Sequence, residues 1–253
     1  MPSPSTSCAT SSSTCSHVAL APTSLLPTSS TSPTPALNAP LTDEQLSTAL
    51  EVIADFTDVK SPYTLGNSRA VADLLAEGAR LRRAALVHDL GRLGVSNSIW
   101  DKQGELTSAE QERVRIHPYL TERMLASSPV LAELGAIAVQ HHERLDGSGY
   151  PRGVSGAAIT PAGRLLAAAD MYSARREPRP HRRARFAEDA AAELRGEVRA
   201  GRLDGSAVEA VLQAAGHRTR RRQEWPAGLT LREGRCCGCW FEGCPPGRSR
   251  SGW

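Results

Sequence analysis

The sequence predicts an all-α protein built around a bundle of about seven helices. Apolar residues recur with a helical period through the middle of the chain, and no segment combines a period of two with β-branched enrichment. A Thr-x-x-Gln and a Thr-x-x-Glu capping box mark two helix starts. We expect a helical domain at 41–217, between a Ser/Thr/Pro-rich segment at 1–40 and a basic, cysteine-rich segment at 218–253.

The composition excludes several classes of protein. Residues 1–40 contain 25 Ser, Thr or Pro and no Asp, Glu, Lys or Arg, so we expect this segment to be disordered. It lacks the basic start and compact apolar block of a signal peptide. No apolar run approaches the ~18 residues of a membrane helix. The net charge of +3 is too balanced to indicate nucleic acid or an anionic membrane. Cysteine is absent from 16 to 235, which favours a cytoplasmic protein over a disulfide-bonded secreted one.

Each helix is predicted from its start signal and its apolar period. Thr42 with Gln45 opens the first helix, Thr107 with Glu110 opens another, and Pro161 suits a first helical turn. A Gly-rich loop is expected at 145–160. The expected helices span 43–58, 67–79, 81–90, 108–127, 129–144, 161–170, 184–200 and 205–215.

Several of the polar residues fall on apolar helical stripes. His88 continues one stripe and is followed by Asp89, His141 and His142 continue a second, and Asp170 continues a third. A buried carboxylate must be neutralised, paired or bound to a metal, because an unpaired buried charge costs several kcal/mol. A single His on an apolar face is usually a hydrogen-bonded core residue. The recurrence of the pattern on separate helices favours a metal site.

The side chains in this cluster indicate which metals it would bind. Imidazole and carboxylate groups without thiolates suit iron, manganese or another divalent ion better than structural zinc. Neighbouring residues diverge by about 100° on a helix, so His88 and Asp89, or His141 and His142, are expected to face different ions. Sites with two metal ions are well suited to phosphate ester hydrolysis.

Four sequence blocks resemble those of a known family. HDLGRLGV (88–95), His117 in RIHPYL, HHERLDGSGYP (141–151) and Asp170 in AAADMYSA follow one another in that order. Together they resemble the HD-GYP branch of the HD phosphohydrolase superfamily, over about 55–217. The resemblance implies an all-α HD domain that holds two or three iron or manganese ions. It also implies hydrolysis of cyclic di-GMP to pGpG or GMP.

The resemblance also implies roles for individual residues. Asp89 would bridge the ions and orient the attacking hydroxide, and Arg92 would act with it in catalysis. Arg179, with Arg182 as a second candidate, would bind phosphate, although a run this basic is often a solvated face. The loop residues Gly149, Tyr150 and Pro151 would border the substrate site and contact partner domains, unless they form an ordinary surface loop. The implied metal ligands are His88, Asp89, His117, His141, His142 and Asp170.

Two departures from the family pattern bear on activity. Asn67 stands where the family has a His, and an amide oxygen is a weaker ligand than imidazole for a transition metal. Arg92 replaces the Lys of HDxGK, which keeps the charge and changes its shape. We therefore expect one or two metal sites and weakened or absent hydrolysis. The alternatives are a non-catalytic metal or nucleotide sensor from a transcriptional regulator, and hydrolysis of another phosphoester. A homo-oligomer is left open.

The C-terminal segment suggests a shifted reading frame. LTLRE at 229–233 resembles the opening of LuxR-type helix-turn-helix domains. Back-translation of 235–253 with GC-rich codons, read in another frame, gives VLRLLVRGLPPRQIAERL, which resembles the continuation of such a domain. We hypothesise that a one-base deletion near codon 234 destroyed a DNA-binding domain, so that DNA binding is lost. The alternative is a genuine small module at Cys236–Cys244, whose spacing fits no zinc pattern well.

Overall fold

The computed structural model describes residues 40–76, 78–179 and 182–217. The segment predicted to be disordered, 1–40, therefore lies outside the described residues apart from Pro40. The same holds for 218–253, the hypothesised frameshifted remnant of a helix-turn-helix. The helices are α1 (Asp43–Asp58), α2 (Asn67–Asp73), α3 (Ala79–Val87), η2 (Leu90–Gly94), α4 (Asn97–Trp100), α5 (Ser108–Arg115), α6 (His117–Leu125), α7 (Pro129–Ala138), η3 (Gly156–Ala158), α8 (Pro161–Arg176), α9 (Ala187–Arg199) and α10 (Gly205–Ala214).

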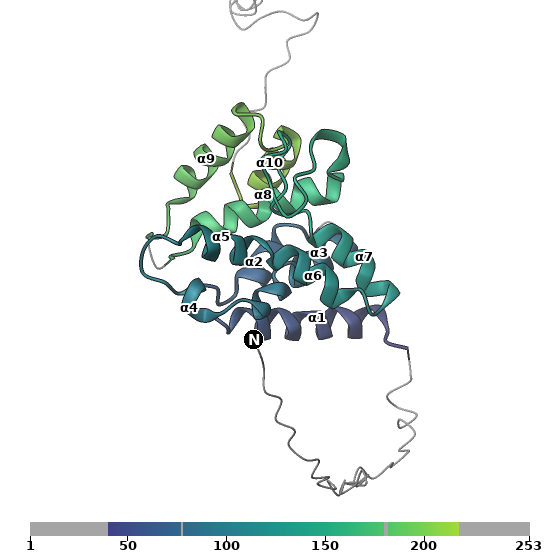
Figure 1. Cartoon of the computed structure of the whole chain (residues 1–253). Coiled ribbons are helices and arrows are strands. Elements are labelled where there is room, and N and C mark those ends of the chain that lie inside the picture. Colours follow the sequence, from purple (N-terminus) through teal and green to yellow (C-terminus); the bar gives the residue numbers. More distant parts are fainter. Residues whose placement is uncertain (1–39, 77, 180–181, 218–253) are drawn as a thin grey trace, which may run out of the picture. The chain divides into compact units, whose positions relative to one another are not determined.

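The described residues form an all-α fold, as the sequence predicts (Figure 1). Helix α7 packs against both α3 and α6, and α8 packs against α9 and α10. The core consists mainly of Leu, Val and Ala side chains, including Leu50 of α1, Leu86 of α3 and Leu166 of α8. Among the described residues, no helix is long and apolar enough to cross a membrane.

Both predicted capping boxes are confirmed. The Thr42 hydroxyl accepts from the Gln45 backbone N–H at 3.2 Å, and the Gln45 side chain accepts from the Thr42 backbone at 2.9 Å. Thr107 and Glu110 form the same reciprocal pair at the start of α5. Pro161 occupies the first turn of α8, as expected. Each capping box satisfies backbone N–H groups that have no partner within the helix, and Pro161 has no N–H to leave without a partner.

The helix predicted at 108–127 is broken into two, and Pro118 explains the break. A continuous helix would need an N–H at residue 118 to bond the Val114 carbonyl, and proline has none. α5 therefore ends at Arg115 and α6 begins at His117. The freed Val114 carbonyl lies 2.6 Å from Nδ1 of His117. The proline thus gives the imidazole a backbone partner.

Two further predicted helices end earlier than expected, which corrects the placement of four site residues. α7 ends at Ala138, so His141 and His142 lie in the turn that follows it. α3 ends at Val87, and the chain continues through His88 and Asp89 into the 3-10 helix η2. Helix ends leave backbone carbonyls without partners, and polar side chains can satisfy them. None of the four residues extends a helical stripe, and the imidazoles of His88 and His141 contact the carbonyls at the ends of α3 and α7.

The remaining differences concern boundaries. α2 ends at Asp73, α8 continues beyond its predicted end to Arg176, and α9 starts at Ala187. The short helix α4 was not predicted, because four residues carry no detectable period.

Candidate metal centre

Three histidines of the centre share one local arrangement at the ends of three helices. Nδ1 of His88 lies 2.7 Å from the Ala85 carbonyl, and Nδ1 of His141 lies 2.6 Å from the Ala138 carbonyl. His117 makes the equivalent contact three residues back, at the end of α5. A carbonyl oxygen has no proton to donate, so the ring nitrogen that contacts it must be the donor, and the proton of each neutral ring lies on Nδ1. Each Nε2 therefore presents a lone pair, as in histidines that bind metals.

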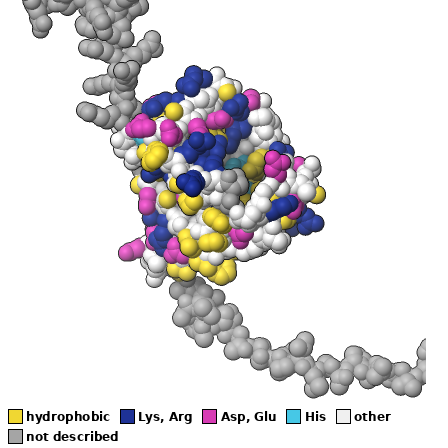
Figure 2. All heavy atoms as spheres, turned by 90° about the vertical axis from the view of Figure 1, so that its left-hand side faces the viewer, with side chains coloured by type: hydrophobic (Ala, Val, Ile, Leu, Met, Phe, Trp, Pro, Cys, Tyr) yellow, Lys and Arg dark blue, Asp and Glu magenta, His cyan; other side chains and the backbone are white. Residues whose placement is uncertain are grey.

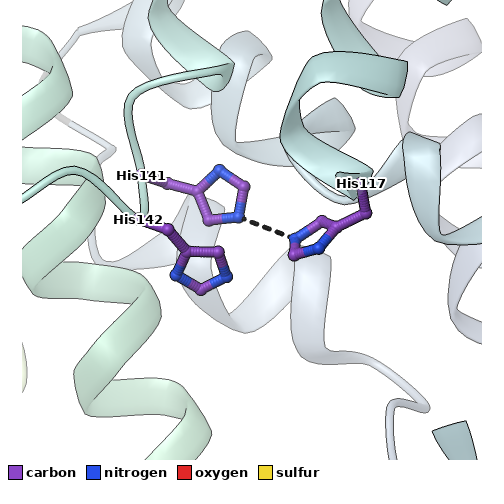
Figure 3. Close-up of side chains that lie close together, drawn as sticks. All are labelled: His117, His141 and His142. Carbon is purple, nitrogen blue, oxygen red and sulfur yellow. Dashed lines mark hydrogen bonds between the residues drawn. The ribbon is translucent and has the colours of Figure 1, made fainter. Parts of the chain in front are cut away.

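These lone pairs converge on one buried point. Nε2 of His117 and Nε2 of His141 lie 3.2 Å apart, and the two rings point toward each other (Figure 3). Neither nitrogen has a proton to donate in this tautomer, so a positive charge between them would stabilise the approach. Bonds of about 2.0–2.1 Å to a shared metal ion would place two ligand atoms about 3.0–3.4 Å apart. The observed spacing fits a cation.

Two carboxylates complete the cluster. Oδ1 of Asp89 lies 3.2 Å from Nε2 of His117 and 3.6 Å from Nε2 of His141. Asp170 of α8 lies 3.5 Å from Nε2 of His88 and 3.7 Å from Nδ1 of His142. Groups of three residues are close enough to hold one ion: His117, His141 and His142, and His88, Asp89 and His141.

The predicted divergence of adjacent residues is wrong. Nε2 of His88 lies 3.1 Å from Oδ2 of Asp89, and the ring centroids of His141 and His142 are 4.1 Å apart. The 100° rotation applies only within a helix, whereas these pairs lie where helices have ended. Adjacent residues therefore converge on a common site.

The local charges favour deprotonated ligands with positive charge between them. Burial lowers the pKa of His117, and it lowers that of His142 further. Burial opposes ionisation of Asp89 and Asp170, but the charge of Arg92 on the first and a hydrogen bond from His88 on the second outweigh it, so both pKa values fall. Burial also lowers the pKa of His88, but the charge of Asp89 and the contact with Asp170 raise it to about 10. The two carboxylates therefore favour positive charge at this imidazole, which a bound cation would also supply.

Gly91 lets the Asp89 segment approach α6. The Gly91 N–H donates to Oγ1 of Thr121 at 2.8 Å, and that hydroxyl donates to the His88 carbonyl at 2.9 Å. A Cβ on Gly91 would overlap the His117 carbonyl oxygen and the Thr121 nitrogen. The glycine of HDLG thus serves close packing between η2 and α6, and sequence reasoning missed Thr121.

Asn67 lies beside this cluster and is fully buried. One atom of its amide lies 3.1 Å from Oγ of Ser173 and 3.1 Å from Oε1 of Glu177, and the other lies 3.5 Å from Oδ2 of Asp89. Only the amide nitrogen can donate to the Ser173 and Glu177 oxygens. The carbonyl oxygen then faces Asp89. Burial raises the pKa of Glu177 to about 7. Ser173 and Glu177 follow Asp170 on α8 without forming a recognisable pattern, so they were not predicted.

Glu143 holds the Gly-rich loop at 145–160 against the centre, and sequence reasoning gave this glutamate no role. We call this segment the GYP loop, after Gly149, Tyr150 and Pro151. Its buried carboxylate accepts from the Arg152 N–H at 2.8 Å and from the Val154 N–H at 3.0 Å. The loop places Tyr150 against His142, with ring centroids 4.7 Å apart. Gly149 is needed for close approach, because a Cβ there would overlap backbone atoms of residues 142–144. Pro151 follows in the same loop through a cis peptide bond.

The centre opens into a cavity of about 990 Å³ that Asp170, His117, His142 and Tyr150 help to line. The chain has two lysines, and both line this cavity. In Figure 2, Lys and Arg side chains gather over the middle of one face, next to a His side chain. The basic lining residues are Lys60, Arg92, Lys102, Arg175, Arg179 and Arg182.

The two predicted phosphate-binding arginines differ in their surroundings. Arg182 donates to the Ala174 carbonyl at 2.6 Å and to the Arg175 carbonyl at 3.2 Å, so its guanidinium caps the end of α8. Arg179 forms a longer contact with Glu177, at 3.4 Å. Its guanidinium has more donors left for a ligand in the cavity.

Comparison with known proteins agrees with this geometry. A family model described as HD domain matches residues 68–207. The 3'3'-cGAMP-specific phosphodiesterase 3 of Vibrio cholerae is 43% identical over 57% of this chain and 34% of its own length. The 3'3'-cGAMP-specific phosphodiesterase 1 of the same organism is 33% identical over 71% of this chain and 44% of its own length. The cyclic di-GMP phosphodiesterase response regulator RpfG of Xanthomonas campestris is 38% identical over 53% of this chain and 35% of its own length.

The matched region contains all six predicted metal ligands, and the chain spans less than half the length of these curated relatives. The matched segment covers more than half of the chain, and its blocks occur in the predicted order. The chain therefore belongs to the HD domain family and carries the motifs of its HD-GYP branch.

Proposed function

We propose that this chain is a metal-dependent phosphodiesterase that hydrolyses a cyclic dinucleotide, with cyclic di-GMP as the first candidate. The observation that carries the proposal is the convergence of imidazole lone pairs and two ionised carboxylates at the base of a basic cavity. The relatives named above are phosphodiesterases of cyclic di-GMP or 3'3'-cGAMP. Cavity size agrees with this class, since about 990 Å³ is at the upper end for ligand sites.

The centre would hold one or two divalent ions, with iron or manganese favoured by its nitrogen and oxygen ligands. The residues proposed to hold them are His88, Asp89, His117, His141, His142 and Asp170. Such ions supply Lewis acidity, which activates water and stabilises charge on a phosphate. Asp89 lies within 3.1–3.6 Å of the imidazoles of His88, His117 and His141, and its carboxylate would be a ligand shared by the ions.

The remaining residues would bind and orient the substrate. Nη2 of Arg92 lies 2.8 Å from Oδ2 of Asp89, and this ion pair would help to hold that carboxylate. Arg179 and the cavity lysines would bind the phosphates of a doubly charged ligand, since guanidinium and ammonium groups match phosphate oxygens. Tyr150, held between His142 and the Arg115 guanidinium, would close one wall.

Asn67 supports a second candidate, a sensor that binds metal or nucleotide without turnover. Its amide oxygen faces Asp89 where the family has an imidazole, and we propose that this cation position is weakened. Hydrolysis would then be slow. The two candidates differ in turnover, and both require metal.

The test is an assay of the purified full chain loaded with Mn²⁺ or Fe²⁺. Cyclic di-GMP and 3'3'-cGAMP are incubated separately, and linear products are measured by chromatography alongside metal content. We expect metal-dependent hydrolysis that Asp89→Asn abolishes. Asp73→Asn, which changes an exposed carboxylate on α2, is the matched control and should retain activity. Binding of both nucleotides by metal-loaded protein without any product would refute the enzyme and support the sensor.

A further inference from the structure

The buried polar atoms without partners fall into two chemical groups. Among the described residues, the side-chain atoms in this state are Nε2 of His88, Oδ1 of Asp89, Nε and Nη1 of Arg92, Nε1 of Trp100 and Nε of Arg175. The His88 and Asp89 atoms face the proposed cation. Arg175 already has the Glu193 carboxylate 2.7 Å away. The remaining three atoms are all N–H donors.

These three donors belong to two side chains that stack on each other. The guanidinium carbon of Arg92 lies 4.9 Å from the centroid of the Trp100 ring. The Trp100 ring also meets His117 edge to face, with centroids 5.6 Å apart. Both side chains line the cavity. The unpaired donors therefore lie next to the proposed metal centre, on the wall that the substrate would face.

Helix α4 fixes the indole in this position. Nδ2 of Asn97 donates to the Lys60 carbonyl at 2.6 Å, and Oδ1 of Asp101 accepts from the Ser61 hydroxyl at 2.6 Å. These bonds tie both ends of the short helix to the segment between α1 and α2. Trp100 thus has little freedom to turn its N–H toward solvent.

The unpaired donors specify the chemistry of a ligand. A buried donor without an acceptor costs ~1–3 kcal/mol, so a ligand that supplies an acceptor is favoured by a similar amount. The guanidinium keeps its charge under all ordinary conditions, which favours an anionic acceptor. Its Nη2 is already held by Asp89, so Nε and Nη1 are fixed in direction. The Nε–H and Nη1–H groups lie on opposite edges of the guanidinium, so one phosphate would accept from one of them, and a charged donor of this kind forms strong hydrogen bonds with phosphate oxygens.

We propose that Arg92 and Trp100 together bind the non-bridging oxygens of the phosphate that sits at the metal centre. Trp100 is then a substrate-binding residue, and its indole N–H is the group that acts. This inference rests on the proposed function for the identity of the substrate, but its donors would bind any phosphate held there.

The probe is inorganic phosphate, titrated calorimetrically into the full chain loaded with Mn²⁺. Trp100→Phe keeps an aromatic ring against Arg92 and removes the N–H. One hydrogen bond to a charged group is worth ~1.5–3 kcal/mol, so we expect phosphate affinity to fall about tenfold or more. Tyr63→Phe, which removes a hydroxyl elsewhere on the cavity lining, is the matched control and should bind as the unaltered protein does. Unchanged affinity in Trp100→Phe at equal metal content would overturn the inference.

A second measurement observes the indole N–H directly in the unaltered protein, and Trp100→Phe serves only to assign its signal. In ¹⁵N-tryptophan-labelled protein loaded with diamagnetic Zn²⁺, the Trp100 indole N–H signal, assigned from its absence in Trp100→Phe, should move downfield as phosphate is added. A signal that stays fixed at saturating phosphate would refute the contact.

An activity assay with cyclic di-GMP separates this inference from the proposed function. With cyclic di-GMP, Trp100→Phe should lower kcat/KM in proportion to its loss of phosphate affinity. Phosphate binding that depends on Trp100 in a protein without turnover would support the inference while the enzymatic proposal fails. Turnover with kcat/KM unaffected by Trp100→Phe would overturn the role of Trp100 and leave the enzymatic proposal intact.

Discussion

Replacing Glu143 by Gln should loosen the GYP loop without touching any proposed metal ligand. The Glu143 carboxylate accepts two backbone N–H groups from the far side of the loop, at 2.8 and 3.0 Å, and is buried. A glutamine keeps the shape but offers one acceptor oxygen. Its amide NH₂ must then face either the Arg152 or the Val154 N–H.

The magnitude follows from these two bonds. One charge-assisted hydrogen bond, worth ~1.5–3 kcal/mol, is lost, and the other becomes a neutral bond of ~1 kcal/mol. Relief from burying a charge offsets part of the loss. We expect the free energy of unfolding to fall by about 2 kcal/mol, or the Tm by about 4–8 °C for a domain of this size.

Urea unfolding of metal-loaded protein measures the change, and hydrogen exchange locates it. Exchange should speed up at 145–160, where the loop leaves Glu143. Glu122→Gln is the control, because that carboxylate pairs with the exposed Arg152 side chain and should contribute below ~1 kcal/mol. An effect of Glu143→Gln no larger than that of the control would refute the reasoning.

Gly91→Ala should lower the free energy of unfolding by about 3 kcal/mol or more and should lower metal content, because the new Cβ would overlap the His117 carbonyl oxygen. Gly196→Ala, in a helix with space for a Cβ, is the control and should be neutral or stabilising in the same urea unfolding assay. Asn67→His should raise the number of bound metal ions per chain, measured by atomic spectrometry, and unchanged content would show that position 67 is no ligand site. Asp204→Ala should lower the free energy of unfolding by ~1 kcal/mol at pH 7, because the Asp204 side chain caps the start of α10. Hydrogen bonds lower the pKa of Asp204 to about 2 from its ordinary 3.8, so this contribution is fully present above about pH 4 and is lost as the pH falls through 2; a difference between the two proteins that is undiminished at pH 2 in urea unfolding would contradict the assignment.

The sequence predicts the fold class and the six clustered residues, because helical period, capping boxes and spaced motifs are local signals. Thr42 and Thr107 cap helices as predicted. The ends of α3 and α7 were misjudged, since apolar residues continue past the last helical residue and the period alone marks no stop. The roles of Glu143 and Trp100 could not be predicted. Both depend on contacts with segments that approach only in the folded chain.

The observed helix ends also bear on how the length of each helix affects the position of the ligands at its end. A ligand on a helical face rotates by 100° for each residue inserted or deleted upstream in that helix. His88, His117 and His141 instead follow the last turn of their helices, each anchored to a carbonyl three residues before it. Lengthening or trimming those helices at their starts leaves each anchor and its imidazole together. The position of each imidazole relative to its own helix end therefore does not depend on the length of that helix.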